Sequence, residues 1–277
     1  MSQLKSFRPS TRSSVGRFGR LASSLLLGLM LAAAGHRVVA QTASPEVAAP
    51  PEVLEAIASL DAAASQEDLQ GVLTFYSPNL VHGDGLTYST LEEALTAFWE
   101  KYDDLAYQTE LTAWEETEDG YVTETTTTVT GVQPLGNRNL TLTSTLTSRQ
   151  RFVDEQIVEQ TILAEESQFT LGDNPPNVEV NLPEEVGIGQ QFYFDAIVLE
   201  PLGDRILLGA ALEEPASPEG YVADAPVELE LLSAGGLFKV GRAPATPGSR
   251  WVSAVIIRED GITAITRRFQ VVSNLIP

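Results

Sequence analysis

His82 and Asp84 are the two residues of this chain whose types and spacing best suit acid–base chemistry. An imidazole titrates near neutral pH, so it can act as a general base without environmental tuning, and a carboxylate two residues away can orient it. The same residues, within the stretch VHGDG, also fit the end of a strand that enters a turn, because glycine supplies positive φ. A catalytic pair and a simple turn both remain open from the sequence.

Patterns for a metal or an organic cofactor are missing from the sequence. His82 with Asp84 makes a poor metal site, since the chain's other histidine, His36, falls in the N-terminal leader. A nucleophile elbow, a P-loop and a dinucleotide fingerprint are likewise missing. We therefore predict neither a metal site nor a cofactor.

Five aromatic residues have a spacing that fits either the lining of an apolar pocket or plain core packing. A pocket of this composition would hold a small apolar or amphipathic ligand. The five candidate ligand-binding residues are Tyr76, Tyr88, Trp99, Tyr102 and Trp114.

The first 40 residues are typical of a signal peptide. They carry basic residues and no acidic one, with an apolar run over residues 21–35 and small residues before a cleavage point after Ala40. The run is shorter than the roughly 20 residues that a membrane span needs, although a retained N-terminal anchor remains the alternative. We expect an exported protein, periplasmic or secreted, without stable membrane insertion after cleavage, and a flexible linker at residues 41–50.

Charge and cysteine content exclude several classes of function. The chain has 17 basic and 38 acidic side chains, a net charge of −21. Because six of the basic residues lie in the leader, the remainder has 11 against 38, or −27. Such a surface repels phosphate backbones and anionic headgroups, so nucleic acid is not an expected partner. The absence of cysteine excludes thiol catalysis, disulfides and cysteine-based zinc sites.

Hydrophobic periodicity changes along the chain. A period of 3.6 predicts helices near residues 53–64, 69–76 and 91–102, the last with a cap from Thr90 and Glu93. A period of 2 then predicts a meander of four long antiparallel strands. Gly172 to Pro176 marks a boundary, and shorter strand-like runs follow, with Asp260-Gly261 predicting a type I′ hairpin between the last two. The four predicted strands of the meander cover residues 105–117, 121–133, 139–152 and 155–170.

Residues 51–171 resemble the nuclear transport factor 2-like superfamily, including its SnoaL-like and ketosteroid isomerase-like branches. The stretches AAASQEDLQGVLTFYSPNLV and TYSTLEEALTAFW carry the resemblance. It implies a cone-shaped curved antiparallel sheet packed on three N-terminal helices. In the isomerase branch a base carboxylate falls at the position of His82, and an oxyanion-stabilising tyrosine falls at Leu60. The resemblance thus makes His82 a candidate base while removing the tyrosine that should assist it.

Residues 177–274 resemble an immunoglobulin-like β-sandwich, so the expected class is α+β followed by an all-β sandwich, with a linker at 172–176. We predict a non-enzymatic protein whose first domain holds a small ligand or forms a homodimer through its sheet. An isomerase, dehydratase or hydrolase that uses His82 is the first alternative. A cell-envelope adhesion or assembly module acting through the sandwich is the second.

Overall fold

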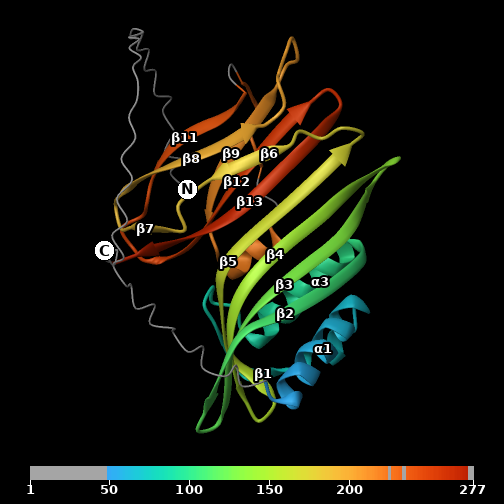
Figure 1. Cartoon of the computed structure of the whole chain (residues 1–277), viewed down its shortest axis with the longest axis vertical. Helices are drawn as coiled ribbons and strands as arrows, with labels where there is room; N and C mark the ends of the chain where they lie inside the picture. The colour runs from blue at the N-terminus through green and yellow to red at the C-terminus, as the bar shows by residue number, and fades with distance from the viewer. Residues whose placement is uncertain (1–48, 224–225, 233–234, 274–277) are drawn as a thin grey trace, which may run out of the picture. The chain divides into compact units, whose positions relative to one another are not determined.

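The computed structural model describes residues 49–223, 226–232 and 235–273 (Figure 1). The predicted signal peptide and most of the predicted linker lie outside the described residues. No helix in the described part of the chain is long and apolar enough to cross a membrane. The helices found there are α1 (Pro51–Ser65), α2 (Leu69–Leu73), α3 (Tyr88–Lys101) and α4 (Pro218–Val222).

Ten strands form one large sheet. Eight of them follow the order β10-β9-β12-β13-β5-β4-β3-β2, while β1 pairs with β5 and β7 pairs with β13. The strands from the N-terminal half are β1 (Tyr76–His82), β2 (Asp103–Thr117), β3 (Gly120–Leu135), β4 (Arg138–Val153) and β5 (Gln156–Gly172). Those from the C-terminal half are β7 (Glu185–Gly187), β9 (Leu208–Pro215), β10 (Glu230–Leu231), β12 (Gly248–Arg258) and β13 (Gly261–Val272).

A second sheet of three strands has the order β11-β8-β6, with β6 at Val178–Asn181, β8 at Gln191–Val198 and β11 at Gly236–Arg242. One side of this sheet packs against β12 and β13, because alternate residues of β8 are buried together with residues of those two strands. The cluster between the sheets includes Phe192, Phe194, Val252, Ile256 and Phe269.

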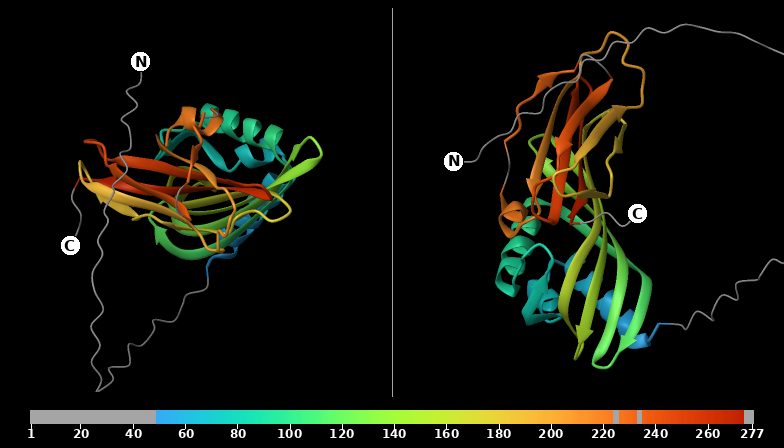
Figure 2. Two further views of the ribbon diagram at one scale, coloured as in Figure 1. Left: turned by 90° about the horizontal axis from the view of Figure 1, so that it is seen from above. Right: turned by 90° about the vertical axis from the view of Figure 1, so that its left-hand side faces the viewer.

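The predicted meander is confirmed, with each strand slightly longer than expected. Strands β3 and β4 pair without interruption from Gly120 opposite Val153 to Leu135 opposite Arg138. The threonine-rich pattern explains the pairing, since Leu142 is buried while its neighbours on either side are exposed. Figure 2 shows how these long strands curve.

The last two strands are neighbours, as the Asp260-Gly261 prediction required, but the turn differs from the predicted one. Arg258 pairs with Gly261, so the two turn residues are Glu259 and Asp260. Neither of these has a positive φ, so the type I′ prediction is wrong. The Arg258 guanidinium binds the Asp260 carboxylate across the turn and holds it closed.

Two of the predicted helix boundaries are also wrong. The third helix begins at Tyr88 because Thr87 and Thr90 cap each other's backbone N–H groups, and the predicted cap from Thr90 and Glu93 does not form. The second helix ends at Leu73, and Tyr76 opens β1 instead of continuing the helix.

Strand β5 has two different partners along one edge. Near its start, Ile157 and Gln160 pair in parallel with β1. Toward its end, Glu166 to Gly172 pair in antiparallel fashion with β13. Residues 161–165 lie between these pairings, so β1 and β13 diverge from β5 there and leave a fork in the sheet.

The predicted fold class is wrong. An α+β domain with three N-terminal helices packed on a cone-shaped sheet, followed by an immunoglobulin-like sandwich, is not what the structure shows. Strands hold 57% of the described residues and helices 18%, and α2 spans only five residues. Through the pairing of β5 with β13, one sheet contains strands from both halves of the chain. The boundary at residues 172–176 stays a prediction.

Candidate functional site

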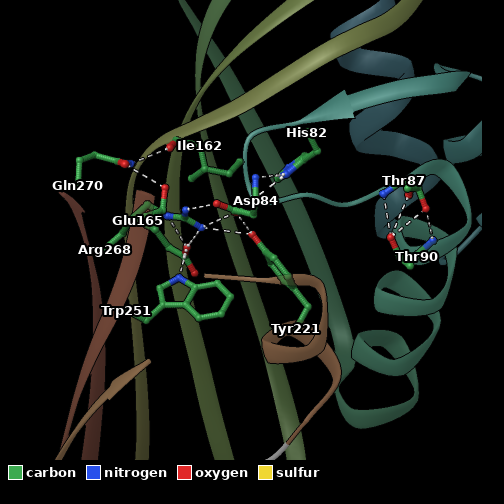
Figure 3. Close-up of polar contacts among 11 residues, drawn as sticks. His82, Asp84, Thr87, Thr90, Ile162, Glu165, Tyr221, Trp251, Arg268 and Gln270 are labelled. Carbon is green, nitrogen blue, oxygen red and sulfur yellow. Dashed lines mark hydrogen bonds and ion pairs between the residues drawn. The ribbon is translucent and has the colours of Figure 1, made fainter. Parts of the chain in front are cut away.

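A buried ion pair between Asp84 and Arg268 lies at the fork beside β5 (Figure 3). Arg268 Nη1 donates to Asp84 Oδ1 at 2.7 Å, and Nη2 donates to Oδ2 at 3.0 Å. The Asp84 side chain is 1% exposed and the Arg268 side chain 0% exposed. Parallel bonds of this kind between a guanidinium and a carboxylate are among the strongest polar contacts in proteins.

Glu165 supplies a second carboxylate to the same guanidinium. Its Oε2 atom accepts bonds from Arg268 Nε at 3.1 Å and Nη2 at 2.8 Å. The indole of Trp251 donates to the same oxygen at 2.8 Å. One cation therefore holds two carboxylates, one from the turn after β1 and one from β5, and this arrangement offsets the large cost of burying charge.

Tyr221 brings α4 into the network. Its hydroxyl donates to Asp84 Oδ2 at 2.6 Å and accepts from Arg268 Nη2 at 3.2 Å. The Tyr221 ring meets the Trp251 ring edge to face at 5.0 Å, and the Arg268 guanidinium lies 5.4 Å from the Trp251 ring centre. Burial raises the pKa of the Tyr221 hydroxyl, which therefore stays protonated and donates.

The chain positions these groups by ending two strand pairings at the fork. Arg268 follows Arg267, the last β13 residue paired with β5, and Asp84 lies two residues past His82, the last paired residue of β1. Trp251 stands opposite Arg268 on β12. Two residues beyond Arg268 on β13, Gln270 connects β13 to β5 again: its side-chain amide donates to the Ile162 carbonyl at 3.4 Å. The five residues Asp84, Glu165, Tyr221, Trp251 and Arg268 are called the fork network below.

His82 lies next to the fork network and is also buried. Its Nδ1 atom accepts the backbone N–H of Asp84 at 3.1 Å, and Nδ1 lies 4.0 Å from the Asp84 carboxylate. A neutral imidazole that accepts through Nδ1 carries its hydrogen on Nε2. Burial lowers the pKa of His82; the Asp84 charge opposes this shift and the Arg268 charge adds to it. The ring is therefore held neutral and serves as an acceptor inside the turn.

The Asp84 carboxylate is held ionised. Burial alone would raise its pKa, but the hydrogen bonds and positive charge of Arg268, with the Tyr221 hydroxyl, outweigh burial and lower it. Both carboxylate oxygens already accept bonds within the fork network. The arrangement is suited to fastening the loop after β1 to β13 and α4.

The structure brings together His82 and Asp84, as the sequence predicted, but it places the aromatic candidates elsewhere. Tyr76, Trp99 and Tyr102 are buried in the core formed by residues of the first 170 positions, and Tyr88 packs against that core. The Trp99 indole donates to the Tyr107 hydroxyl at 3.0 Å. Trp114 lies on β2, where its ring meets that of Tyr121 at 6.2 Å.

Leu60 also packs against this core, at the position where the resemblance puts an oxyanion-stabilising tyrosine. The tyrosine that does approach Asp84 is Tyr221, which comes from the other half of the chain. Its hydroxyl is bound to the carboxylate and to Arg268, so it is already engaged within the fork network.

Two surface hollows among the described residues are not lined by any predicted site residue. One is lined by residues at the end of α3, the start of β2 and the end of β3, among them Lys101 and Gln133. The other is lined by residues in and beside the β3–β4 and β12–β13 turns, among them Arg138 and Asp260. Among the described residues, no group of three or more histidine, aspartate or glutamate side chains is placed to hold a metal ion.

Sequence reasoning missed Arg268, Glu165 and Tyr221. Arg268 lies 184 positions from Asp84 and 103 from Glu165, so spacing carries no sign of their contact. One signal was available: Arg267-Arg268 places two cations in an otherwise alternating strand of a very acidic chain. A cation on the buried side of a strand requires a carboxylate partner.

The titration of His82 should make folding stability fall in mild acid. Its folded pKa lies below the unfolded value of about 6.5, so the unfolded chain binds more protons there and stability declines as pH falls below that value. His82→Asn keeps an acceptor near the Nδ1 position and removes the titration. Urea unfolding at pH 7.5 and pH 5 should show a smaller loss for the variant; equal losses would contradict the assignment.

A family model described as a domain of unknown function (DUF8623) matches residues 173–272. No curated protein matches the chain. An LEH-like epoxide hydrolase from M. tuberculosis is similar at 13% identity and a TM-score of 0.28, over 40% of this chain and 80% of that one.

A hypothetical protein of ketosteroid isomerase-like fold from Catenulispora acidiphila DSM 44928, in complex with trimethylamine, is similar at 10% identity and a TM-score of 0.29. The likeness covers 39% of this chain and 83% of that one. Both structures are of the kind that the resemblance of residues 51–171 implies, and no comparison shows an immunoglobulin-like second half. At these TM-scores neither likeness carries an argument about activity or ligand.

Proposed function

We propose that this chain is an exported, non-enzymatic binding protein that contacts its partner through open faces of its sheets. The observation that carries the proposal is the state of the candidate catalytic pair. His82 Nδ1 is bound to the Asp84 backbone, and both Asp84 oxygens are bound to Arg268 and Tyr221. The pair is used to hold the structure together.

An enzyme that used His82 as its general base would need an imidazole nitrogen free to accept a proton from a substrate. In the neutral ring the accepting nitrogen is Nδ1, and that atom already accepts the Asp84 N–H. The lowered pKa of His82 further weakens its basicity. These two features speak against the isomerase, dehydratase or hydrolase alternative.

The position of the aromatic residues argues for binding at an outer surface. Tyr76, Trp99 and Tyr102 are part of a packed core, so their rings contact other side chains of that core. The sheets, in contrast, carry exposed side chains on broad faces, such as Tyr193 on β8 and Phe238 on β11. Export is supported by the basic leader and its apolar run at residues 21–35.

A turnover screen tests the non-enzymatic proposal. Purified protein and its His82→Asn variant are incubated with a β,γ-unsaturated ketone, an epoxide and an activated ester, which represent isomerase and hydrolase chemistry. We expect no turnover above the buffer rate from either protein. Turnover by the wild-type chain that the folded His82→Asn variant loses would refute the proposal, because it would assign the base role to His82.

A further inference from the structure

The outer side of the three-stranded sheet carries a cluster of aromatic and acidic residues. Along β8, Phe192, Phe194 and Ala196 are buried against the large sheet, so the residues between them point to the opposite side. On β11, Leu237 is buried and Phe238 is exposed. This outer side, called the aromatic–acid face below, comprises Glu179 and Asn181 on β6, Gln191, Tyr193, Asp195 and Ile197 on β8, and Phe238, Val240 and Arg242 on β11.

Two large rings on this face are open to solvent. Tyr193 is 65% exposed and Phe238 is 52% exposed. Strand register places Tyr193 opposite Val240 and Phe238 opposite Asp195, so the two rings are diagonal neighbours on adjacent strands. Exposed aromatic residues gathered on one sheet face are typical of binding surfaces, where tyrosine supplies large contact area at low entropic cost.

One carboxylate lies directly beside these rings, and a second lies further along the same face. Asp195 stands between Phe238 on one neighbouring strand and Asn181 on the other, and Glu179 stands opposite Ile197. Within the described residues, no arginine or lysine forms an ion pair with Asp195 or Glu179. Arg242 lies on the same face at the far end of β11, opposite Gln191, and directs its guanidinium to the Gly189 carbonyl. At the other end of β11, the face presents the negative charge of Asp195 next to the open ring of Phe238.

Rings and carboxylates side by side recognise cations. An ammonium or guanidinium group above an exposed ring gains about 0.5–1 kcal/mol, and an exposed ion pair adds about 0–1 kcal/mol. Each contact is weak, so useful affinity requires a partner that places several cations on the face at once. The strongly acidic composition of the chain would also attract such a partner and speed its association.

We infer that the aromatic–acid face binds a lysine- and arginine-rich peptide segment of a partner protein. The inference rests on the proposed function, since it names the partner class of an open sheet face. A second copy of the chain fits less well, because two surfaces of the same strong negative charge repel each other. Anionic lipid headgroups are disfavoured for the same reason.

Fluorescence anisotropy of a labelled decalysine peptide tests the inference on the full chain. Measurement in about 0.15 M salt screens general attraction and leaves close contacts. The double variant Tyr193→Ala/Phe238→Ala should weaken binding about tenfold, as expected from losing two cation–ring contacts. Asp195→Asn should weaken it about threefold. Both variants should fold normally, because the substituted side chains face solvent.

Glu110→Gln provides the matched control, since it removes one negative charge at an exposed position on β2, in the other sheet. It should change peptide affinity less than twofold. Equal weakening by Glu110→Gln and Asp195→Asn, with no effect of the ring variant, would overturn the inference in favour of general charge attraction. Self-association that the ring variant abolishes would overturn it in favour of a second copy. Neither outcome touches the turnover screen, on which the proposed function stands or falls.

Discussion

Replacing Arg268 with methionine should lower the free energy of unfolding by about 3–5 kcal/mol, the usual cost of removing one partner from a buried ion pair. The reason is that the buried Asp84 carboxylate and the partly buried Glu165 carboxylate would both remain without a cation. Urea unfolding at pH 7 measures the change. If the variant does not fold, Arg268→Lys keeps the charge, loses the paired bonds and should show an intermediate loss.

Arg267 is the matched control for this substitution. It is the preceding residue of the same strand, and its side chain is 38% exposed where it pairs with Glu166 at 2.8 Å. An exposed pair contributes about 0–1 kcal/mol, so Arg267→Met should cost little. Similar losses for Arg267→Met and Arg268→Met would mean that burial of the Asp84 pair is not what stabilises the fork.

Trp251→Ala should also be severely destabilising, by about 3–5 kcal/mol, as for other buried aromatic residues. Its ring fills the space between Tyr221 and Arg268, and its N–H satisfies Glu165. The substitution thus opens a cavity and also removes one donor from a carboxylate that stays in place. Thermal unfolding followed by circular dichroism measures the effect.

Trp114→Ala is the comparison for Trp251→Ala. Trp114 is half-buried on β2 and meets Tyr121 at 6.2 Å, so less apolar area returns to water when its ring is removed. We expect no more than about half the cost of Trp251→Ala. A larger loss at Trp114 than at Trp251 would show that the fork network adds little to stability.

Local sequence patterns predicted the elements that depend on neighbouring residues. The alternation of leucine and threonine over residues 139–147 was enough to predict β4 and its buried side, and short turns predicted the meander. The predictions of one turn type and one helix cap were wrong, because side-chain contacts determine both features. Arg258 closes a two-residue turn without positive φ, and Thr87 replaces Thr90 as the helix cap.

The fold class could not be predicted because it depends on one long-range pairing. Residues 166–172 of β5 pair with residues 261–267 of β13, and this pairing joins strands of both halves into one sheet. Strand register of this kind is set by side-chain burial across strands that are far apart in sequence. Neither strand carries a local signal for its partner.

The candidate site likewise combines local features with long-range contacts. His82 and Asp84 were predicted from residue type and spacing alone, and the structure places them together. Their role depends on Arg268, which comes from the last strand of the chain, and on Tyr221 from α4. Without these partners, the sequence favoured a simple turn and left a catalytic pair open; with them, Asp84 is a buried counter-ion.

A double-mutant cycle between Asp84 and Arg268 tests most directly whether the fork network holds the two halves of the chain together. The free energy of unfolding is measured for wild type, Asp84→Asn, Arg268→Met and the double variant at pH 7. We predict a coupling energy of about 1–3 kcal/mol, because the second substitution costs much less once the first has broken the pair. Losses that add within about 0.5 kcal/mol would contradict the account.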